Sequence, residues 1–369
     1  MPIDPRSWTR ETLERHSVDM RQFIDFRQST LPNGSRIIEA YNSSGLTLSI
    51  LPDRGLDIWA AHYNGIPLTW ISQGSPHPPD FGLNWLQQFN GGLLTTCGLA
   101  HVGPPEKDDI SGEARDIHGR YSRLRAGHVN VEELGWVNGH FDLDLSGTVT
   151  ESSLFGHQLK LIRNYSMTLG VPAVSWVDQI TNVGDQPAPL MLLYHINPGF
   201  PLVSEGTELH TAHKAVYPRD AAAKAGYERW SHYDAATAAY PEQVFFHHPL
   251  KVDHMAQAFI GHEDFALRVT WNADSMPYFN QWKNTRQGAY VSGIEPSNSI
   301  PEGQNAARRN NRLPVLQPGE MVSFYTRIDI LDSTSAVTAA KHELEAIRQS
   351  GKPSENCHLD DYAQFARQK

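Results

Sequence analysis

Alternation of apolar and polar residues with a period of two is the feature of this sequence that most constrains its fold. It recurs near residues 46–50, 141–145, 265–271 and 322–330. Successive side chains of a strand point to opposite faces, so this period predicts half-buried β-strands. Turn sequences separate these stretches, among them Pro32-Asn33-Gly34, Asn64-Gly65 and Asn138-Gly139. The pattern predicts a mainly antiparallel, all-β protein.

Helical periodicity is scarce and peripheral. The stripe of Val337, Ala340, Leu344 and Ile347 predicts a helix over about residues 335–350, ended by Gly351. A shorter helix is predicted over residues 9–18. The alanine-rich segment 218–240 is predicted to be an excursion between strands.

The chain has 369 residues and no Gly/Ser-rich linker, internal repeat or charge block. We therefore predict one domain over residues 1–369, with a sandwich core over about 35–332 and the helix at about 335–350 after it. A β chain of this length is too long for a small barrel. It fits a large antiparallel two-sheet sandwich with a concave outer face, or tandem smaller sandwiches, and the missing linker favours the first.

Charge and cysteine content limit the classes of partner. The 31 basic and 41 acidic side chains give a formal net charge of −10, whereas nucleic-acid binding usually needs a basic surface. No partner nucleic acid or membrane is expected. The first twenty residues lack the apolar core of a signal peptide, and the two cysteines lie far apart in sequence, which indicates a soluble, cytoplasmic protein. Cys97 is predicted to be a small buried hydrophobe.

Glu295 is the first candidate for chemistry, because it follows an apolar strand and precedes Pro296. A strand end held by sheet hydrogen bonds orients a side chain well, and proline prevents the strand from continuing over it. The alternative is a solvated rim glutamate in a salt bridge, which is the commoner state of a carboxylate. Sequence position leaves both readings open.

His195 is the second candidate. It interrupts an apolar run and precedes Asn197-Pro198-Gly199, which predicts a position near a sheet edge. Imidazole titrates near neutral pH, so it can donate or accept a proton. A core histidine bonded to a backbone carbonyl explains the position equally well.

The polar turn Asp116-Ile117-His118-Gly119-Arg120 is the third candidate, since His118 and Arg120 both carry donors suited to a ligand. His-Gly is also a common turn dipeptide. The 18 histidines show no recognised metal-ligand spacing, so no metal site is predicted. Trp59, Trp70, Trp85 and Trp136 have faces suited to sugar C–H groups, although most aromatic side chains of a sandwich belong to its core.

Six segments together resemble the aldose 1-epimerase (galactose mutarotase-like) superfamily, and specifically a bacterial branch of it. They follow the family's order from about residue 35 to 330. The segments are Pro52-Asp53-Arg54-Gly55-Leu56-Asp57-Ile58, Asn90-Gly91-Gly92-Leu93-Leu94-Thr95-Thr96-Cys97-Gly98-Leu99, Ile117-His118-Gly119, Leu193-Tyr194-His195-Ile196-Asn197, Gln281-Trp282-Lys283 and Gly293-Ile294-Glu295-Pro296.

This resemblance implies a β-supersandwich that binds a sugar on its concave face and needs no metal or organic cofactor. It also implies that Glu295 is a base and His195 an acid, on opposite sides of one sugar-sized pocket. Opening a pyranose removes the proton of the anomeric hydroxyl while the ring oxygen gains one, and the reverse transfer closes the ring from either face.

The resemblance extends to the substrate-binding residues. His118 resembles the family's second histidine, which binds sugar hydroxyls, and Trp282 resembles an aromatic beside the site. Asn197 and Gln281 are further substrate-binding candidates.

Two departures from the galactose enzymes bear on the substrate. Those enzymes carry Asn before the acid histidine and a Tyr-Phe-Asn cluster after it, whereas here Tyr194 precedes His195 and Asn197-Pro198-Gly199-Phe200 follow. Their substrate-binding arginine has two candidates here, Arg54 and Arg120, and Arg54 suits an ion pair with Asp57 equally well. Two arginines near a site would suit a carboxylate, sulfonate or phosphate, so a sugar other than galactose, or a sugar acid, is plausible.

The sequence therefore predicts a cofactor-independent aldose 1-epimerase (mutarotase), or a closely related sugar isomerase or epimerase. It would act on a free monosaccharide or sugar acid, as a monomer or homodimer. Two alternatives stay open: a non-catalytic carbohydrate-binding or regulatory protein on the same scaffold, and a lyase or hydrolase acting on a glycoside or uronate. The Glu and His pair is compatible with all three.

Overall fold

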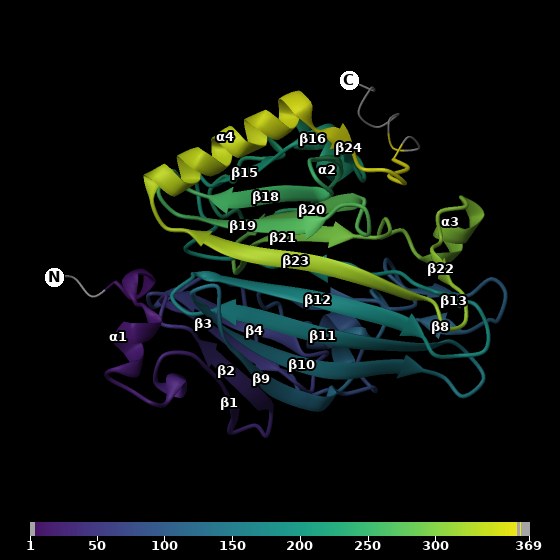
Figure 1. Ribbon diagram of the computed structural model, residues 1–369. Coiled ribbons are helices and arrows are strands. Elements are labelled where there is room, and N and C mark those ends of the chain that lie inside the picture. The colour runs from purple at the N-terminus through teal and green to yellow at the C-terminus, as the bar shows by residue number, and fades with distance from the viewer. Residues whose placement is uncertain (1–3, 360–361, 363–369) are drawn as a thin grey trace.

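The computed structural model describes residues 4–359 and 362, which fold mainly into stacked antiparallel sheets (Figure 1). Within these residues the largest sheet has eight strands, in the order β15 (Glu208–Thr211), β18 (Met255–Gly261), β19 (Ala266–Asn272), β23 (Met321–Leu331), β12 (Ala173–Asn182), β11 (Gln158–Thr168), β10 (His140–Ser152) and β9 (Gly127–Val137). The predicted antiparallel β-sandwich is confirmed.

A second sheet carries the residues of chemical interest. Its strands, within the described part of the chain, are β16 (His213–Pro218), β17 (Gln243–Lys251), β20 (Tyr278–Arg286), β21 (Ala289–Ser297), β14 (Leu193–His195) and β6 (Thr95–Cys97), with β24 (Lys352–Pro353) beside β17. A further sheet holds β1 (Asp25–Thr30), β2 (Arg36–Tyr41), β3 (Leu46–Leu51), β4 (Asp57–Tyr63) and β5 (Ile66–Pro67). Two short ribbons pair β7 (Glu106–Lys107) with β8 (Ala114–Arg115), and β13 (Ala188–Pro189) with β22 (Val315–Leu316).

The alternating pattern places apolar side chains between the sheets. On β10, Phe141, Leu143 and Leu145 are buried, and the register pairs Leu145 with Tyr165 of β11. These side chains share one hydrophobic core with Trp176 of the same sheet and with residues of the other two large sheets. A common core explains why the sheets stack face to face.

The helices lie at the edges of the sandwich (Figure 1). In α4 (Thr334–Ser350), Ser333 caps the first turn, and Val337, Ala340 and Leu344 pack onto the sheets, which confirms the predicted helix. At the N-terminus, α1 (Arg10–Glu14) is shorter than the predicted 9–18. Leu13 is its one buried residue, so little packing supports a longer helix.

The remaining helical segments are short. As predicted, residues 218–240 form an excursion between β16 and β17. The short helical segments of the described chain, of which α2 and η5 lie in this excursion, are α2 (Ala221–Ala225), α3 (Gln304–Arg309), η1 (Pro5–Ser7), η2 (Met20–Gln22), η3 (Trp85–Gln88), η4 (Tyr121–Arg123) and η5 (Tyr227–Arg229). Across the described residues, no helix combines the length and apolar character that crossing a membrane requires.

A buried ionic cluster joins residues of the three large sheets. The Arg163 guanidinium on β11 lies 2.7 Å from Asp57 Oδ1 on β4 and 2.6 Å from Asp178 Oδ2 on β12. Asp57 also accepts hydrogen bonds from the backbone N–H and the hydroxyl of Thr96 on β6. The suggested ion pair of Asp57 with Arg54 is therefore wrong, because Arg163 is the cation that Asp57 meets.

Candidate active site

Cross-strand register brings the two catalytic candidates together. Leu193 of β14 pairs with Ser297 of β21, and a bridge joins Ile196 to Ile294, so His195 lies opposite Glu295. Opposed residues of neighbouring strands point to the same face of a sheet. His195 and Glu295 therefore share the face turned away from the main core, and two residues about a hundred positions apart in sequence become neighbours.

His195 Nε2 lies 3.3 Å from Glu295 Oε1, and the two side chains are only 7% and 5% exposed. They are adjacent on one surface and not on opposite walls of a pocket, which corrects the expected arrangement. The physical reason is the strand register, which sets directly opposed side chains side by side. Both groups can still reach one hemiacetal, because the anomeric hydroxyl and the ring oxygen are attached to the same carbon.

Burial shifts the proton affinities of the two groups in opposite directions. It raises the pKa of Glu295 to about 8, with a smaller contribution from the negative charge of Glu242, opposed by Arg219. Burial lowers the pKa of His195 to about 4, opposed by the Asn197 amide. At neutral pH the pair therefore holds one proton, on Glu295. This protonation state suits Glu295 to donate a proton and His195 to accept one, whereas the sequence predicts Glu295 as the base and His195 as the acid.

Aromatic rings surround the pair. The ring centroids of Phe89 and Trp282 lie 5.3 and 5.4 Å from that of His195, both nearly edge-on. Trp85 stacks on Phe89 at 4.3 Å, and Trp70 contacts both Phe89 and Trp282. These four rings, Phe89, Trp282, Trp85 and Trp70, form what we call the aromatic cover. Such rings offer flat apolar faces to the C–H groups of a sugar.

His118 joins this cluster, as predicted. Its ring lies 6.2 Å from that of His195 and 5.0 Å from that of Trp85. Burial lowers the pKa of His118 to about 3, with smaller contributions from His195 and His101, so the ring is neutral at pH 7. Its buried Nδ1 has no hydrogen-bond partner. A buried polar atom in this state marks a position that a ligand hydroxyl can satisfy.

Asn197 stabilises the backbone next to His195. The side chain is fully buried, and its Nδ2 donates to the carbonyl oxygens of Gly92 and of His195 itself. Asn197 therefore fixes the end of β14, while its buried Oδ1 has no hydrogen-bond partner.

Arg54 does not reach the pair. It is buried, and its three nitrogens donate to the carbonyl oxygens of Ser122, His77 and Gln88. Two of these carbonyls belong to the segment 72–90, which supplies Trp85 and Phe89 to the aromatic cover. Arg54 thus anchors the cover, and the sequence-based assignment to substrate binding does not fit its position.

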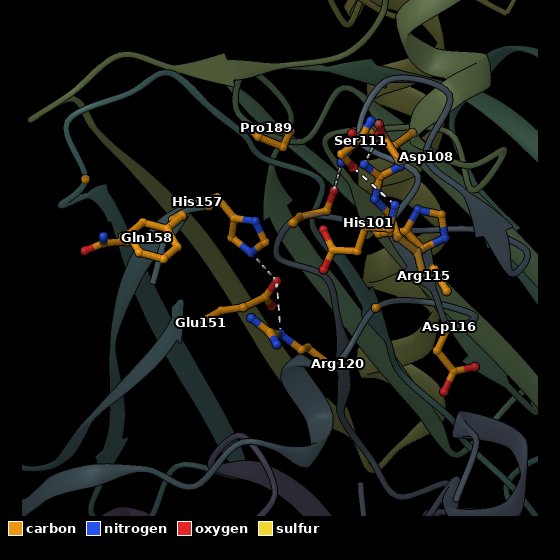
Figure 2. Close-up of a pocket in the computed structure, with 18 of the residues that line it drawn as sticks. His101, Asp108, Ser111, Arg115, Asp116, Arg120, Glu151, His157, Gln158 and Pro189 are labelled. Atoms are coloured by element: carbon orange, nitrogen blue, oxygen red, sulfur yellow. Dashed lines mark hydrogen bonds and ion pairs between the residues drawn. The ribbon is translucent and has the colours of Figure 1, made fainter. Parts of the chain in front are cut away.

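Arg120 and Gln281 point elsewhere as well. Arg120 donates to Ser152 O and lies 3.9 Å from Glu151, at a separate cavity (Figure 2). Gln281 is buried on the opposite face of β20 from Trp282, where its Nε2 donates to Trp230 O. Alternation along the strand gives the reason, because neighbours such as Gln281 and Trp282 cannot share a face.

Sequence reasoning missed two charged residues beside the pair, Glu242 and Arg219, which form the charged rim of this face. Trp282 Nε1 donates to Glu242 Oε2 at 2.9 Å, and Arg219 lies 3.1 Å from Glu242 and 2.8 Å from Asp220. Glu242 precedes β17 and Arg219 follows β16, so long-range strand pairing brings them here. No local motif marks them. Within the described residues, no group of three His, Cys, Asp or Glu side chains is arranged to hold a metal ion.

The fold is that of the galactose mutarotase-like superfamily. A protein of Klebsiella pneumoniae named as a "putative aldose 1-epimerase" is 26% identical, with 89% of this chain and 88% of that chain covered and a TM-score of 0.80. Two more distant structures share the fold. They are a galactose mutarotase-like protein of Clostridium acetobutylicum (14% identity, 84% and 99% covered, TM-score 0.60) and a galactose 1-epimerase of Lactobacillus acidophilus (13%, 84% and 99%, 0.54).

Within this superfamily, the chain belongs to the family described as "Domain of unknown function (DUF4432)", whose model matches residues 32–330. No curated protein matches the sequence.

Proposed function

We propose that this protein is an aldose 1-epimerase that interconverts the anomers of a free monosaccharide by proton transfer alone. One observation carries the proposal. A carboxyl group and an imidazole lie 3.3 Å apart on a buried, aromatic-lined surface and together hold one proton at neutral pH. The resemblance to structures named as aldose 1-epimerases supports it.

The proton balance of the reaction suits this pair. Ring opening moves one proton from the pair to the ring oxygen and one from the anomeric hydroxyl to the pair, as the bond between the anomeric carbon and the ring oxygen breaks. Glu295 donates and His195 accepts. Rotation about the adjacent carbon–carbon bond then presents the other face of the aldehyde. Closure reverses both transfers, so the pair returns to its starting state and no external acid or base is consumed.

The low exposure of the pair sets a condition on binding. With side chains 5% and 7% exposed, Glu295 and His195 contact a sugar only when part of the aromatic cover moves aside. The segment 72–90 carries Trp85 and Phe89 and is closed at its base by the bridge between Ile71 and Gly91. We infer that the part of this segment around Trp85, between the carbonyls of His77 and Gln88 that Arg54 holds, moves to admit the sugar.

The charges at the rim favour a neutral sugar over a sugar acid. Arg219 is the nearest cation in the contacts described above, and it already pairs with Asp220 and Glu242. An anionic substrate would meet one compensated arginine and two carboxylates. The proposal therefore names a neutral aldose as the substrate.

The test is two-dimensional NMR exchange between α and β anomers, run with a panel of free aldoses and with the matching uronic acids. We expect accelerated exchange for at least one neutral aldose and its loss in Glu295→Gln. The matched control is Glu39→Gln, an exposed glutamate on β2. Unchanged exchange in Glu295→Gln, or no acceleration for any sugar, would refute the proposal. Binding in calorimetry without exchange would indicate a non-catalytic sugar-binding protein. A new product mass from a glycoside or uronate would indicate a lyase or hydrolase.

A further inference from the structure

A cavity of about 1440 Å³ lies apart from the catalytic candidates. Its walls come from residues 81–84, the loops within 100–123, the β10–β11 turn, the segment 183–189 and the region of α3 (Figure 2). Neither His195 nor Glu295 lines it. Asp116 belongs to its wall and accepts a hydrogen bond from the backbone N–H of Trp85, so the cavity lies behind the aromatic cover.

The charged groups of this cavity are nearly balanced and are held in place by one another. Its lining contains four arginines and five carboxylates: Arg115, Arg120, Arg123 and Arg308, with Asp108, Glu113, Asp116, Glu151 and Asp185. Arg115 and Arg308 both contact Asp108, and Arg123 lies 3.3 Å from Asp116. An anion finds no excess of positive charge here, and a cation gains little, so the charge balance favours a neutral ligand.

The Glu151 carboxylate orients the side chains of His157 and Arg120 on one wall of the cavity. Oε1 of Glu151 lies 2.9 Å from His157 Nε2, while Oε2 accepts a hydrogen bond from the backbone N–H of Leu99 (Figure 2). Glu151 is almost fully buried, but His157 is 16% and Arg120 37% exposed. Arg120 uses one N–H group on Ser152 O, and a guanidinium has five. The guanidinium thus has N–H donors left for hydroxyl groups, and the imidazole, held by Glu151 through Nε2, has its Nδ1 left.

Large apolar side chains gather around these polar groups. Among the residues lining the cavity, Phe81 is 65% and Phe155 97% exposed, and Ile110, Leu154 and Val315 are exposed as well. Exposed apolar side chains scattered singly need no explanation, but several around one cavity indicate a binding site.

We propose that this cavity binds a neutral oligosaccharide. Fixed, planar polar side chains suit ring hydroxyls, which both donate and accept, and exposed aromatic faces suit the C–H faces of the sugar rings. The volume exceeds the range of about 300–1,000 Å³ of pockets for single small molecules, which leaves room for a ligand of several sugar units. Neither His195 nor Glu295 lines this site, so its binding is tested separately from the activity proposed for the pair.

The test is isothermal titration of the full chain with neutral tetrasaccharides, using α- and β-linked glucose, β-linked mannose, β-linked galactose and β-linked xylose. A tetramer of galacturonic acid is the charged comparison. Phe155→Ser and Arg120→Gln remove one apolar and one polar contact from exposed positions. Leu134→Ser is the control for the apolar change, since Leu134 is an exposed apolar residue on β9, outside the cavity. Glu295→Gln tests whether binding belongs to the catalytic pair.

We expect at least one neutral tetrasaccharide to bind, with affinity reduced about tenfold by Phe155→Ser and by Arg120→Gln, as loss of one ring stacking or one charged hydrogen bond predicts. Leu134→Ser and Glu295→Gln should leave it unchanged. The proposal fails if no neutral tetrasaccharide binds at millimolar concentration, or if the galacturonate tetramer binds more tightly. It also fails if Glu295→Gln abolishes binding while Phe155→Ser and Arg120→Gln do not.

Discussion

Tyr194 and His195 are consecutive residues of β14, yet they lie on opposite faces of the sheet, and the polar groups of these two faces have different partners. Tyr194 points into the core, where its hydroxyl donates to Asp178 Oδ2 at 2.6 Å beside Arg163. His195 points outward, towards Glu295 and the aromatic cover, and its buried Nδ1 has no hydrogen-bond partner. Both faces are buried and polar.

The difference lies in how completely each polar group is satisfied. On the inner face, Arg163 compensates two carboxylates, and Thr96 and Tyr194 donate to the same carboxylates. On the outer face, burial shifts the pKa values of Glu295 and His195 towards their neutral forms, and His118 Nδ1 is also unpartnered. A saturated network supports the fold, whereas an unsaturated one beside a cover is suited to a ligand. Mutations on the two faces should therefore separate stability from activity.

The largest effect on activity is expected for His195→Asn. Loss of the imidazole removes one partner of the proton exchange, and general acid–base groups typically contribute about 10²–10⁴-fold in rate. Anomer exchange should fall by that factor, while thermal unfolding stays within a few degrees of the wild type. If His195→Asn lowers the unfolding temperature but leaves anomer exchange unchanged, His195 stabilises the fold, as Tyr194 does, and takes no part in the reaction.

Arg163→Met should produce the largest loss of stability. Methionine keeps the volume but leaves Asp57 and Asp178 without their cation, and removing one partner of a buried ion pair costs about 3–5 kcal/mol. Urea unfolding measures this cost. Anomer exchange by the fraction that stays folded should be within about twofold of the wild type, since no atom of Arg163 faces the outer surface. A stable but inactive variant would contradict the division between the faces.

Tyr194→Phe isolates the smallest part of the inner network. It removes one hydrogen bond to a charged carboxylate, and such bonds contribute about 1.5–3 kcal/mol. Urea unfolding should show a loss in that range, and exchange should be unchanged. A loss of exchange comparable with that of His195→Asn would show that the two faces are coupled.

The sequence was sufficient to predict the strands, because a period of two is a local property. The alternation near residues 141–145 and 322–330 matches β10 and β23, and the stripe at 335–350 matches α4. The N-terminal helix was predicted too long because its sequence alone does not reveal that packing supports a single side chain, Leu13. Local pattern predicts where an element forms, and tertiary contact decides how far it extends.

The candidate site was predicted less completely, for a related reason. His195, Glu295, His118 and Trp282 were placed together by resemblance, and the structure brings them together. The sequence offers Arg54 and Arg120 as candidates for the family's substrate-binding arginine, but their hydrogen bonds direct them elsewhere. Arg219 and Glu242 reach the rim through the pairing of β16, β17 and β20, which no short stretch of sequence encodes.

The pH dependence of activity offers a sharper probe of the outer face. The pair holds one proton between the pKa of His195, about 4, and that of Glu295, about 8. Exchange should be fastest between these values and should fall on both sides, because a second proton removes the base and loss of the first removes the acid. A rate that keeps rising above pH 9 would contradict this assignment.

Linkage gives the same assignment an independent check in stability. The folded pKa of Glu295 lies above the ordinary glutamate value of 4.5, so its stabilising contribution is full below pH 4.5 and is lost as the pH rises through about 8. His195 has the opposite sign, because its folded pKa lies below 6.5 and its contribution is lost as the pH falls from 6.5 through 4. In Glu295→Gln the loss between pH 4.5 and 8 should be absent from urea unfolding curves.

The smallest expected effect, and the most specific, is a shift of the alkaline side of the pH–rate profile. The charges of Glu242 and Arg219 at the rim cause this shift. Glu242 raises and Arg219 lowers the pKa of Glu295, so Glu242→Gln should move this side of the profile to lower pH and Arg219→Gln should move it to higher pH. Both shifts are minor beside the effect of burial, since these side chains are 50% and 38% exposed and water screens their charges. Glutamine keeps an acceptor for Trp282 Nε1.

Measurements at high salt distinguish this electrostatic effect from a displacement of the Trp282 indole, because salt screens charges but does not move the ring back. Opposite shifts that shrink in 1 M salt, where the screening length is about 3 Å, would establish that the rim acts on Glu295 through charge. Shifts of the same sign in both variants, unchanged by salt, would instead mean that Trp282 moves against His195 when its partner is altered, and the rim would then be a positioning element of the outer face.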